Sequence, residues 1–139
     1  MLKTLACATT VAFLALSSAA QAQTCARNFK TTGVPLITGL TYSSWSLYAG
    51  LNPAKALDNA ARALEAEGID VVSINKKAGV LQATQDGAEN GRPQRIRVTA
   101  RKAGGATRVD LQFAVQPGQF SNASVVRSYI CGVIDAAGR

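Results

Sequence analysis

Histidine is absent from this 139-residue chain, and no other absence in its composition removes as much chemistry. Histidine is the commonest general base and the commonest metal ligand, so Ser-His-Asp and Cys-His catalysis are both excluded. Glu65 and Glu67 lie two residues apart and do not share a helix face. The sequence therefore predicts no catalytic residue, no metal site and no cofactor. A small secreted enzyme without histidine stays a distant alternative.

Acidic residues and long apolar runs are scarce as well. The chain has 8 Asp and Glu against 15 Lys and Arg, which gives a formal net charge of +7. Such a balance favours anionic partners and carries no information about the fold. Beyond the N-terminal segment, no apolar run approaches the length of about 18 residues that a transmembrane helix needs. We therefore expect no transmembrane helix in the mature chain.

The N-terminus has the three-part layout of a secretory signal peptide. Lys3 supplies the positive charge, an apolar stretch runs from Leu5 to Leu16, and Ala20-Gln21-Ala22 provides the small residues that signal peptidase reads. Cleavage of residues 1–22 would leave 117 residues, enough for one domain. The alternatives are an uncleaved membrane anchor and lipidation. We expect a secreted or periplasmic protein with a signal of bacterial type.

That cleavage decides which cysteines are present in the mature chain and can pair. Cys7 leaves with the signal peptide, so Cys25 and Cys131 remain in the mature chain. Two cysteines in an oxidising compartment most simply form one disulfide. Two free thiols, or a bridge between chains, are the alternatives.

The hydrophobic pattern predicts an irregular arm over residues 23–39 and a single domain over residues 40–139. Asn52-Pro53 favours a helix start and Gly68 a helix stop. A second helix should begin at Ser121 or Asn122. The expected elements are a strand over Leu40–Tyr48, a helix over Pro53–Glu67, strands over Ile69–Asn75 and Val80–Gln85, two strands around 95–101 and 108–115, and a helix to about Ala137.

Alternation of apolar and polar residues predicts how these strands pair. A four-residue turn over 103–106 pairs Ala100 with Val109, Val98 with Leu111 and Ile96 with Phe113. A turn over 76–79 pairs Ile74 with Leu81 and Val72 with Ala83, with all four side chains on one face. The order β-α-β-β-β-β-α predicts an α+β fold, in which an antiparallel sheet of four to five strands carries two helices on one face.

The stretch from Asn52 to Gln116 resembles small bacterial envelope domains of unknown or accessory function. It contains an Ala-rich helix that ends in Gly, the hairpin segment EGIDVVSINKKAGVLQATQ and the turn segment KAGGATRVD. The layout is also similar to the helix-grip domains of outer-membrane assembly lipoproteins, although this chain lacks their lipid-attachment cysteine. The resemblance implies an accessory role in the cell envelope and transfers no functional residue.

Four arginines are the candidate binding residues. Arg95, Arg97 and Arg101 should point the same way on one strand, with Arg108 opposite Arg101 and Asp110 the only acid among them. Guanidinium groups suit phosphate and carboxylate, so this face could bind an anionic envelope component or an acidic protein. A solvated face whose charges prevent aggregation is the alternative. No exposed aromatic interleaves with the arginines, which leaves no strong nucleic-acid signal.

A second candidate surface is the set Tyr42, Trp45 and Tyr48, spaced three residues apart. These side chains could form a platform for carbohydrate or peptide, but packing in the core and at the sheet edge is the better interpretation.

The function inferred from the sequence is therefore a non-catalytic secreted or periplasmic accessory domain that binds an anionic surface or partner through its basic sheet face. A structural or protein-docking module that uses an edge strand or the aromatic set is the alternative. The oligomeric state stays open.

Overall fold

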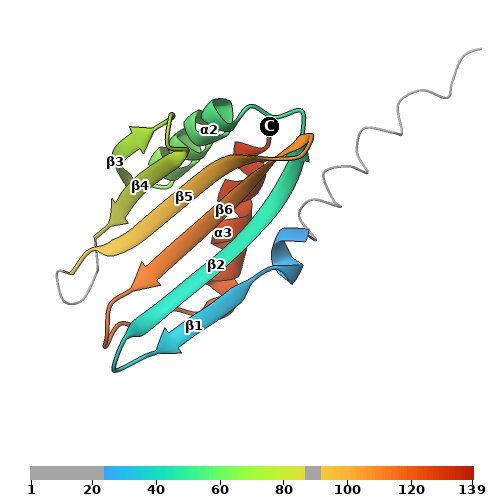
Figure 1. Ribbon diagram of the computed structural model, residues 1–139. Helices are drawn as coiled ribbons and strands as arrows, with labels where there is room; N and C mark the ends of the chain where they lie inside the picture. Colours follow the sequence, from blue (N-terminus) through green and yellow to red (C-terminus); the bar gives the residue numbers. More distant parts are fainter. Residues whose placement is uncertain (1–23, 87–91) are drawn as a thin grey trace, which may run out of the picture.

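The structure is a computed structural model that describes residues 24–86 and 92–139 (Figure 1). The expected signal peptide lies outside these ranges. Six strands form one antiparallel sheet in the order β1-β2-β6-β5-β4-β3. The strands are β1 (Lys30–Val34), β2 (Gly39–Ala49), β3 (Asp70–Asn75), β4 (Val80–Gln85), β5 (Gln94–Ala103) and β6 (Ala106–Val115).

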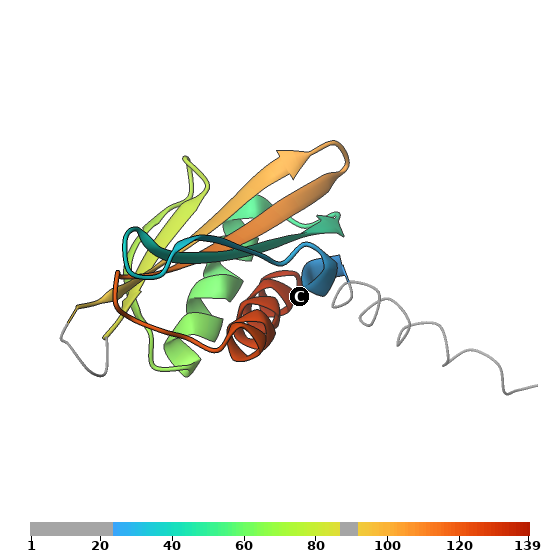
Figure 2. The same cartoon turned by 90° about the horizontal axis from the view of Figure 1, so that it is seen from below.

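Helices α2 (Pro53–Ala66) and α3 (Ala123–Ala137) pack side by side on one face of this sheet (Figure 2). A short helical turn covers residues 24–27. The α+β class is as predicted. In both helices an asparagine accepts backbone N–H bonds at the N-terminus: Asn52 from Ala54, and Asn122 from Ser124 and Val125. Asn122, rather than Ser121, is thus the cap of α3.

The predicted sheet of four to five strands was too small, because the arm over 23–39 is not irregular throughout. It contains β1, which pairs with β2 from Lys30 opposite Ser43 to Val34 opposite Gly39. All five residues of β1 are exposed, so the strand has no apolar alternation from which it could be recognised. Its pairing with the free edge of β2, rather than its own pattern, defines it.

The predicted register between β5 and β6 is confirmed. Ala100 lies opposite Val109, Val98 opposite Leu111 and Ile96 opposite Phe113. Pairing continues to Ala103 and Ala106, so the turn is Gly104-Gly105 alone rather than four residues. A two-residue turn and a four-residue turn with the same centre give the same register, which explains why the predicted pairs hold.

The predicted register between β3 and β4 is only half right. Ile74 pairs with Leu81 as expected, but Ala83 pairs with Val71 because the ladder shifts between Val71 and Ser73. This β-bulge adds one residue to β3, so Val72 leaves the buried face and is 64% exposed. The apolar pattern alone cannot tell which of the adjacent residues Val71 and Val72 faces the core, because the bulge changes the alternation between them.

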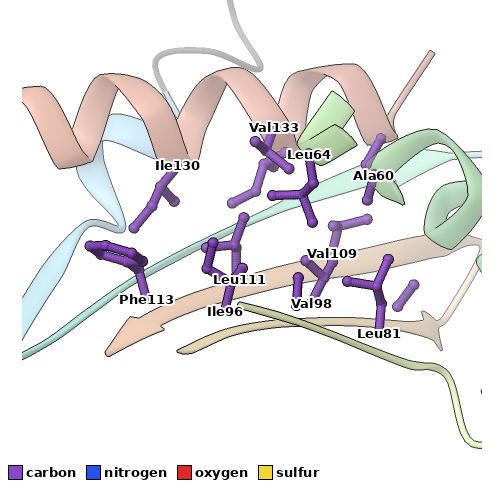
Figure 3. Packing of buried hydrophobic residues seen from close by; sticks show 14 of the residues in the cluster. Ala60, Leu64, Leu81, Ile96, Val98, Val109, Leu111, Phe113, Ile130 and Val133 are labelled. Atoms are coloured by element: carbon purple, nitrogen blue, oxygen red, sulfur yellow. The ribbon is translucent and has the colours of Figure 1, made fainter. Parts of the chain in front are cut away.

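The core lies between the helices and the sheet. Figure 3 shows Leu64 of α2 and Ile130 and Val133 of α3 pointing toward the sheet. The sheet residues that meet them include Val98 and Leu111, which are fully buried. Each large aliphatic side chain buried in this way contributes about 1.5–3 kcal/mol to folding.

The predicted disulfide between Cys25 and Cys131 is present, with the two Cα atoms 5.7 Å apart. It joins the helical turn at 24–27 to α3, and the Ser44 hydroxyl of β2 donates to the carbonyl of Cys25. Closing a loop of 106 residues is worth roughly 4–5 kcal/mol in the chain-entropy model. The N-terminal segment is thereby fixed to both layers.

Within the described ranges, no helix is long and apolar enough to cross a membrane.

A glycine comparison tests the contact between the β3–β4 turn and β5. Gly79 has φ +72°, and a Cβ there would lie 2.4 Å from the carbonyl oxygen of Ala100. Gly104 has φ +63° but open space around it. The left-handed backbone costs either alanine about 1–2 kcal/mol. Gly79→Ala adds a steric clash, so it should lower the free energy of unfolding clearly more than Gly104→Ala. Urea denaturation measures both, and equal losses would contradict this packing.

Candidate functional site

The sheet has one face under the helices and one face with no described element over it. Directly paired residues of an antiparallel sheet project from the same face, so the register gives the surface row by row. One row crosses the whole sheet through Arg97, and the row beside it passes through Arg95. We call this surface the outer face. The Arg97 row is Lys30, Ser43, Gln112, Arg97, Gln82 and Ser73, and the Arg95 row is Thr32, Thr41, Ala114, Arg95, Thr84 and Asp70.

Arg95, Arg97 and Arg101 are exposed on the outer face, as the alternation of β5 predicts. None of the three forms an ion pair with a described residue. Arg97 lies directly between Gln82 of β4 and Gln112 of β6. Its guanidinium group therefore has neutral amide neighbours on both sides, which leaves its charge free to attract an anion.

A groove of about 370 Å³ follows the Arg95 and Arg97 rows. Its lining includes both arginines, Gln82, Gln112 and Thr84, and none of the lining residues is acidic. The small side chain of Ala114 lies between Thr41 and Arg95, which leaves room for the groove. We call it the outer-face groove. Asp70 lies beyond it, at the edge strand.

A second and more open hollow of about 780 Å³ lies on the other side of Arg97. It is formed against the β3–β4 hairpin by residues that include Ser73, Asn75 and Gln82. Lys76 also lines it, but its ammonium group is 2.8 Å from the carboxylate of Asp58. Arg97 thus stands between two hollows. An extended ligand could pass over it from one to the other.

Arg108 differs from the other three candidates. It lies opposite Arg101 as predicted, but its guanidinium group is only partly exposed and binds both carboxylate oxygens of Asp110 at 2.7–3.0 Å. The same group lies 4.2 Å from the centre of the Trp45 ring. Its charge is compensated locally, so Arg108 is a poor anion ligand. The sequence showed Asp110 nearby but not that the two residues form a bidentate pair.

The aromatic set does not form one platform. Tyr42 and Tyr48 point into the core, where their hydroxyls donate to the carbonyls of Ser121 and Ile134, both at 3.0 Å. Burial, with the nearby Asp135 carboxylate, raises the pKa of Tyr48 above its ordinary value. Trp45 lies on the outer face instead. Residues three apart on a strand project from opposite faces, so Tyr42 and Tyr48 share the buried face and Trp45 lies on the other. The tyrosines therefore pack in the core.

Sequence reasoning named the arginines and missed the polar residues around them. Gln82, Thr84 and Gln112 are part of the groove lining. The sequence does indicate that these side chains face outward, because each occupies a polar position in a strand of alternating apolar and polar residues. What the sequence could not supply was the strand order that puts β4 and β6 on either side of β5.

Comparison with known protein families and with curated proteins finds no match for this chain. Among solved structures, the chain is similar to the crystal structure of Ara h 8.0201, with 12% identity and a TM-score of 0.48. The similarity covers 70% of this chain and 94% of that one. A likeness this distant assigns no site and no activity here.

Trp45 is the single tryptophan of the chain, so the fluorescence reports on the surroundings of this one ring, where Arg108 stacks. Arg108→Gln removes the group that covers the ring and exposes the indole to water. Its emission should therefore move to longer wavelength, while the circular dichroism of the fold stays unchanged. Arg101→Gln, an equivalent change on the neighbouring strand, should leave the emission where it is. An unshifted spectrum in Arg108→Gln would show that the stack is absent in solution.

Proposed function

We propose that this protein is a non-catalytic accessory domain that binds an anionic surface or partner through the outer-face groove. The observation that carries the proposal is the pair Arg95 and Arg97, exposed beside a groove whose lining contains no acidic residue. The net charge of +7 supports it, because a positive chain attracts anionic partners over a distance.

The chemistry of the groove fits an anion with several oxygen atoms. A guanidinium group presents donors in a planar fork that matches phosphate and carboxylate. Gln82 and Gln112 beside Arg97 can donate further hydrogen bonds or accept them from hydroxyl groups. Arg95 and Arg97 are two residues apart on one strand, about 6.6 Å along it. This spacing favours a ligand with repeated anionic groups over a single ion.

Export to the periplasm or the cell exterior is part of the proposal. The signal-peptide pattern of the first 22 residues supports it. The Cys25–Cys131 disulfide supports it as well, since disulfides persist in oxidising compartments. In that setting the anionic partner would belong to the cell envelope, as a lipid head group, an anionic polymer or an acidic protein.

A protein-docking module is the second candidate, and exposed apolar residues favour it. Leu36, Ile37 and Phe120 are between 72% and 75% exposed. They lie in two neighbouring loops, because the Gly118 N–H donates to the Pro35 carbonyl at 3.1 Å. An apolar cluster of this kind is a common feature of protein contacts. Tyr42 and Tyr48, in contrast, are buried and are not available for docking.

Charge reversal tests the proposal. Arg95→Glu/Arg97→Glu should weaken binding to phosphatidylglycerol vesicles or to hexaglutamate by at least about tenfold, since two charge-assisted contacts are lost. Lys55→Glu/Arg127→Glu is the matched control, because it makes the same change in net charge at exposed positions of the two helices. The control should lose much less. Binding is measured by vesicle sedimentation and by calorimetry.

Salt separates the two candidate functions. Binding through the arginines should weaken steeply as salt rises past about 0.1 M, where charges are screened beyond about 10 Å. Docking through Leu36, Ile37 and Phe120 should tolerate salt. If Arg95→Glu/Arg97→Glu folds normally and retains both the vesicle and the peptide interaction, the outer-face groove is not the binding site.

A further inference from the structure

A separate hollow of about 350 Å³ opens at one end of the molecule, between the sheet and the helices. It lies where α2 ends, α3 begins and the ends of β4, β5 and β6 meet. Its apolar lining comes from Ile69, Phe113, Val125 and Val126, and the Tyr129 ring also lines it. We call it the end hollow. Its volume falls within the range of about 300–1,000 Å³ that is usual for small-molecule sites.

Tyr129, which lines this hollow, carries an unsatisfied hydroxyl. The Tyr129 hydroxyl is shielded from solvent and has no hydrogen-bond partner among the described residues. The other two tyrosines, Tyr42 and Tyr48, both donate to backbone carbonyls. Buried hydroxyls are nearly always hydrogen-bonded, so an exception calls for a specific explanation. Because a water-sized molecule cannot touch this hydroxyl as it stands, a ligand in the hollow supplies the missing partner when the Tyr129 side chain turns toward it.

The ring of Tyr129 is held in place by its neighbour. Its centre lies 6.4 Å from that of Phe113, with the two rings inclined at 64°. This edge-to-face arrangement is a favourable one for aromatic pairs. It gives the hollow an aromatic wall against which a flat, apolar molecule can pack.

Charge further restricts what the end hollow can accept. Glu67 is the one charged side chain in its described lining, and no lysine or arginine accompanies it there. Burial first, and then the charge of Glu67, raises the pKa of Tyr129 to about 12, so this hydroxyl stays protonated at neutral pH. The hollow therefore disfavours anions. Its preference is opposite to that of the outer-face groove.

We propose that the end hollow binds a compact, mainly apolar ring compound with a hydroxyl or amine head group. The ring packs against Phe113 and Val126, and the head group hydrogen-bonds with Glu67 and with the hydroxyl of Tyr129, whose side chain turns toward the ligand. This site does not depend on the anion-binding function. It uses different residues, the opposite charge preference and a different part of the fold.

Three probes with the same ring and different head groups test this assignment. They are 1-naphthol, 1-naphthylmethylamine and 1-naphthoate, each titrated into the disulfide-bonded protein and followed by calorimetry and by amide chemical shifts. The alcohol and the amine should bind saturably and shift the amide signals of Phe113 and Val126. The carboxylate should bind much more weakly. Glu67→Gln should reduce the preference for the amine over the alcohol.

Two substitutions locate the site. Val125→Trp should fill the mouth of the hollow and abolish saturable binding. Val72→Trp is the matched control, because Val72 is 64% exposed and Val125 65% exposed, and Val72 lines the outer-face groove instead. Tyr129→Phe removes a hydroxyl that has no hydrogen-bond partner within residues 24–86 and 92–139, so the fold should keep its stability. Affinity for 1-naphthol should fall about fivefold with the loss of one hydrogen bond.

Three results would overturn the proposal: no saturable binding by any probe, tightest binding by 1-naphthoate, or undiminished binding in Val125→Trp. Each leaves the charge-reversal test of the outer-face groove unaffected. Conversely, loss of vesicle binding in Arg95→Glu/Arg97→Glu, with naphthol binding intact, would confirm that the two sites are independent.

Discussion

The pairing of β5 with β6 in a single register is the constraint on which the rest of the structure depends. It places Val98 opposite Leu111, and it turns the large apolar side chains of the two strands toward α2 and α3. A shift by one residue would turn that apolar set toward water and bring the arginines into the core. Burying unpaired guanidinium groups is prohibitively expensive, so the register and the basic outer face are two consequences of the same pairing.

The two layers are then fixed to each other by contacts at several places. The Cys25–Cys131 disulfide ties the N-terminal turn to α3, and Tyr48 of β2 donates to the Ile134 carbonyl of the same helix. The Asn59 amide of α2 donates to the Ala137 carbonyl, at 3.2 Å. Such anchoring covers one face of the central strands and leaves their opposite face free of any described element. The sheet therefore presents Arg95 and Arg97 two residues apart on one strand, with Gln82 and Gln112 beside Arg97, which is the arrangement on which the proposed anion site rests.

The sequence predicts an element correctly where burial of one face gives it a regular spacing of apolar residues. It does not predict an element that lacks such a spacing. The helices, the β5–β6 register and the disulfide follow from apolar spacing, caps and cysteine count. β1 carries no apolar pattern, because all its residues are exposed at the sheet edge. The bulge at Val72 depends on packing between strands, and the pairing of Arg108 with Asp110 depends on side-chain geometry. The glutamines around Arg97 were visible as outward positions, but only the strand order identifies them as neighbours of the arginines.

The most direct test of the outer-face groove observes the arginines themselves. In the nuclear magnetic resonance spectrum, each arginine side chain gives its own Nε–H signal, which moves when its guanidinium group binds an anion. On titration with hexaglutamate, the signals of Arg95 and Arg97 should move together and saturate. Those of Arg62 and Arg127, on the helix layer, should stay in place. If all four signals drift in parallel without saturation, or if only those of the helices respond, the groove is not an anion site and its arginines serve only as a solvated surface.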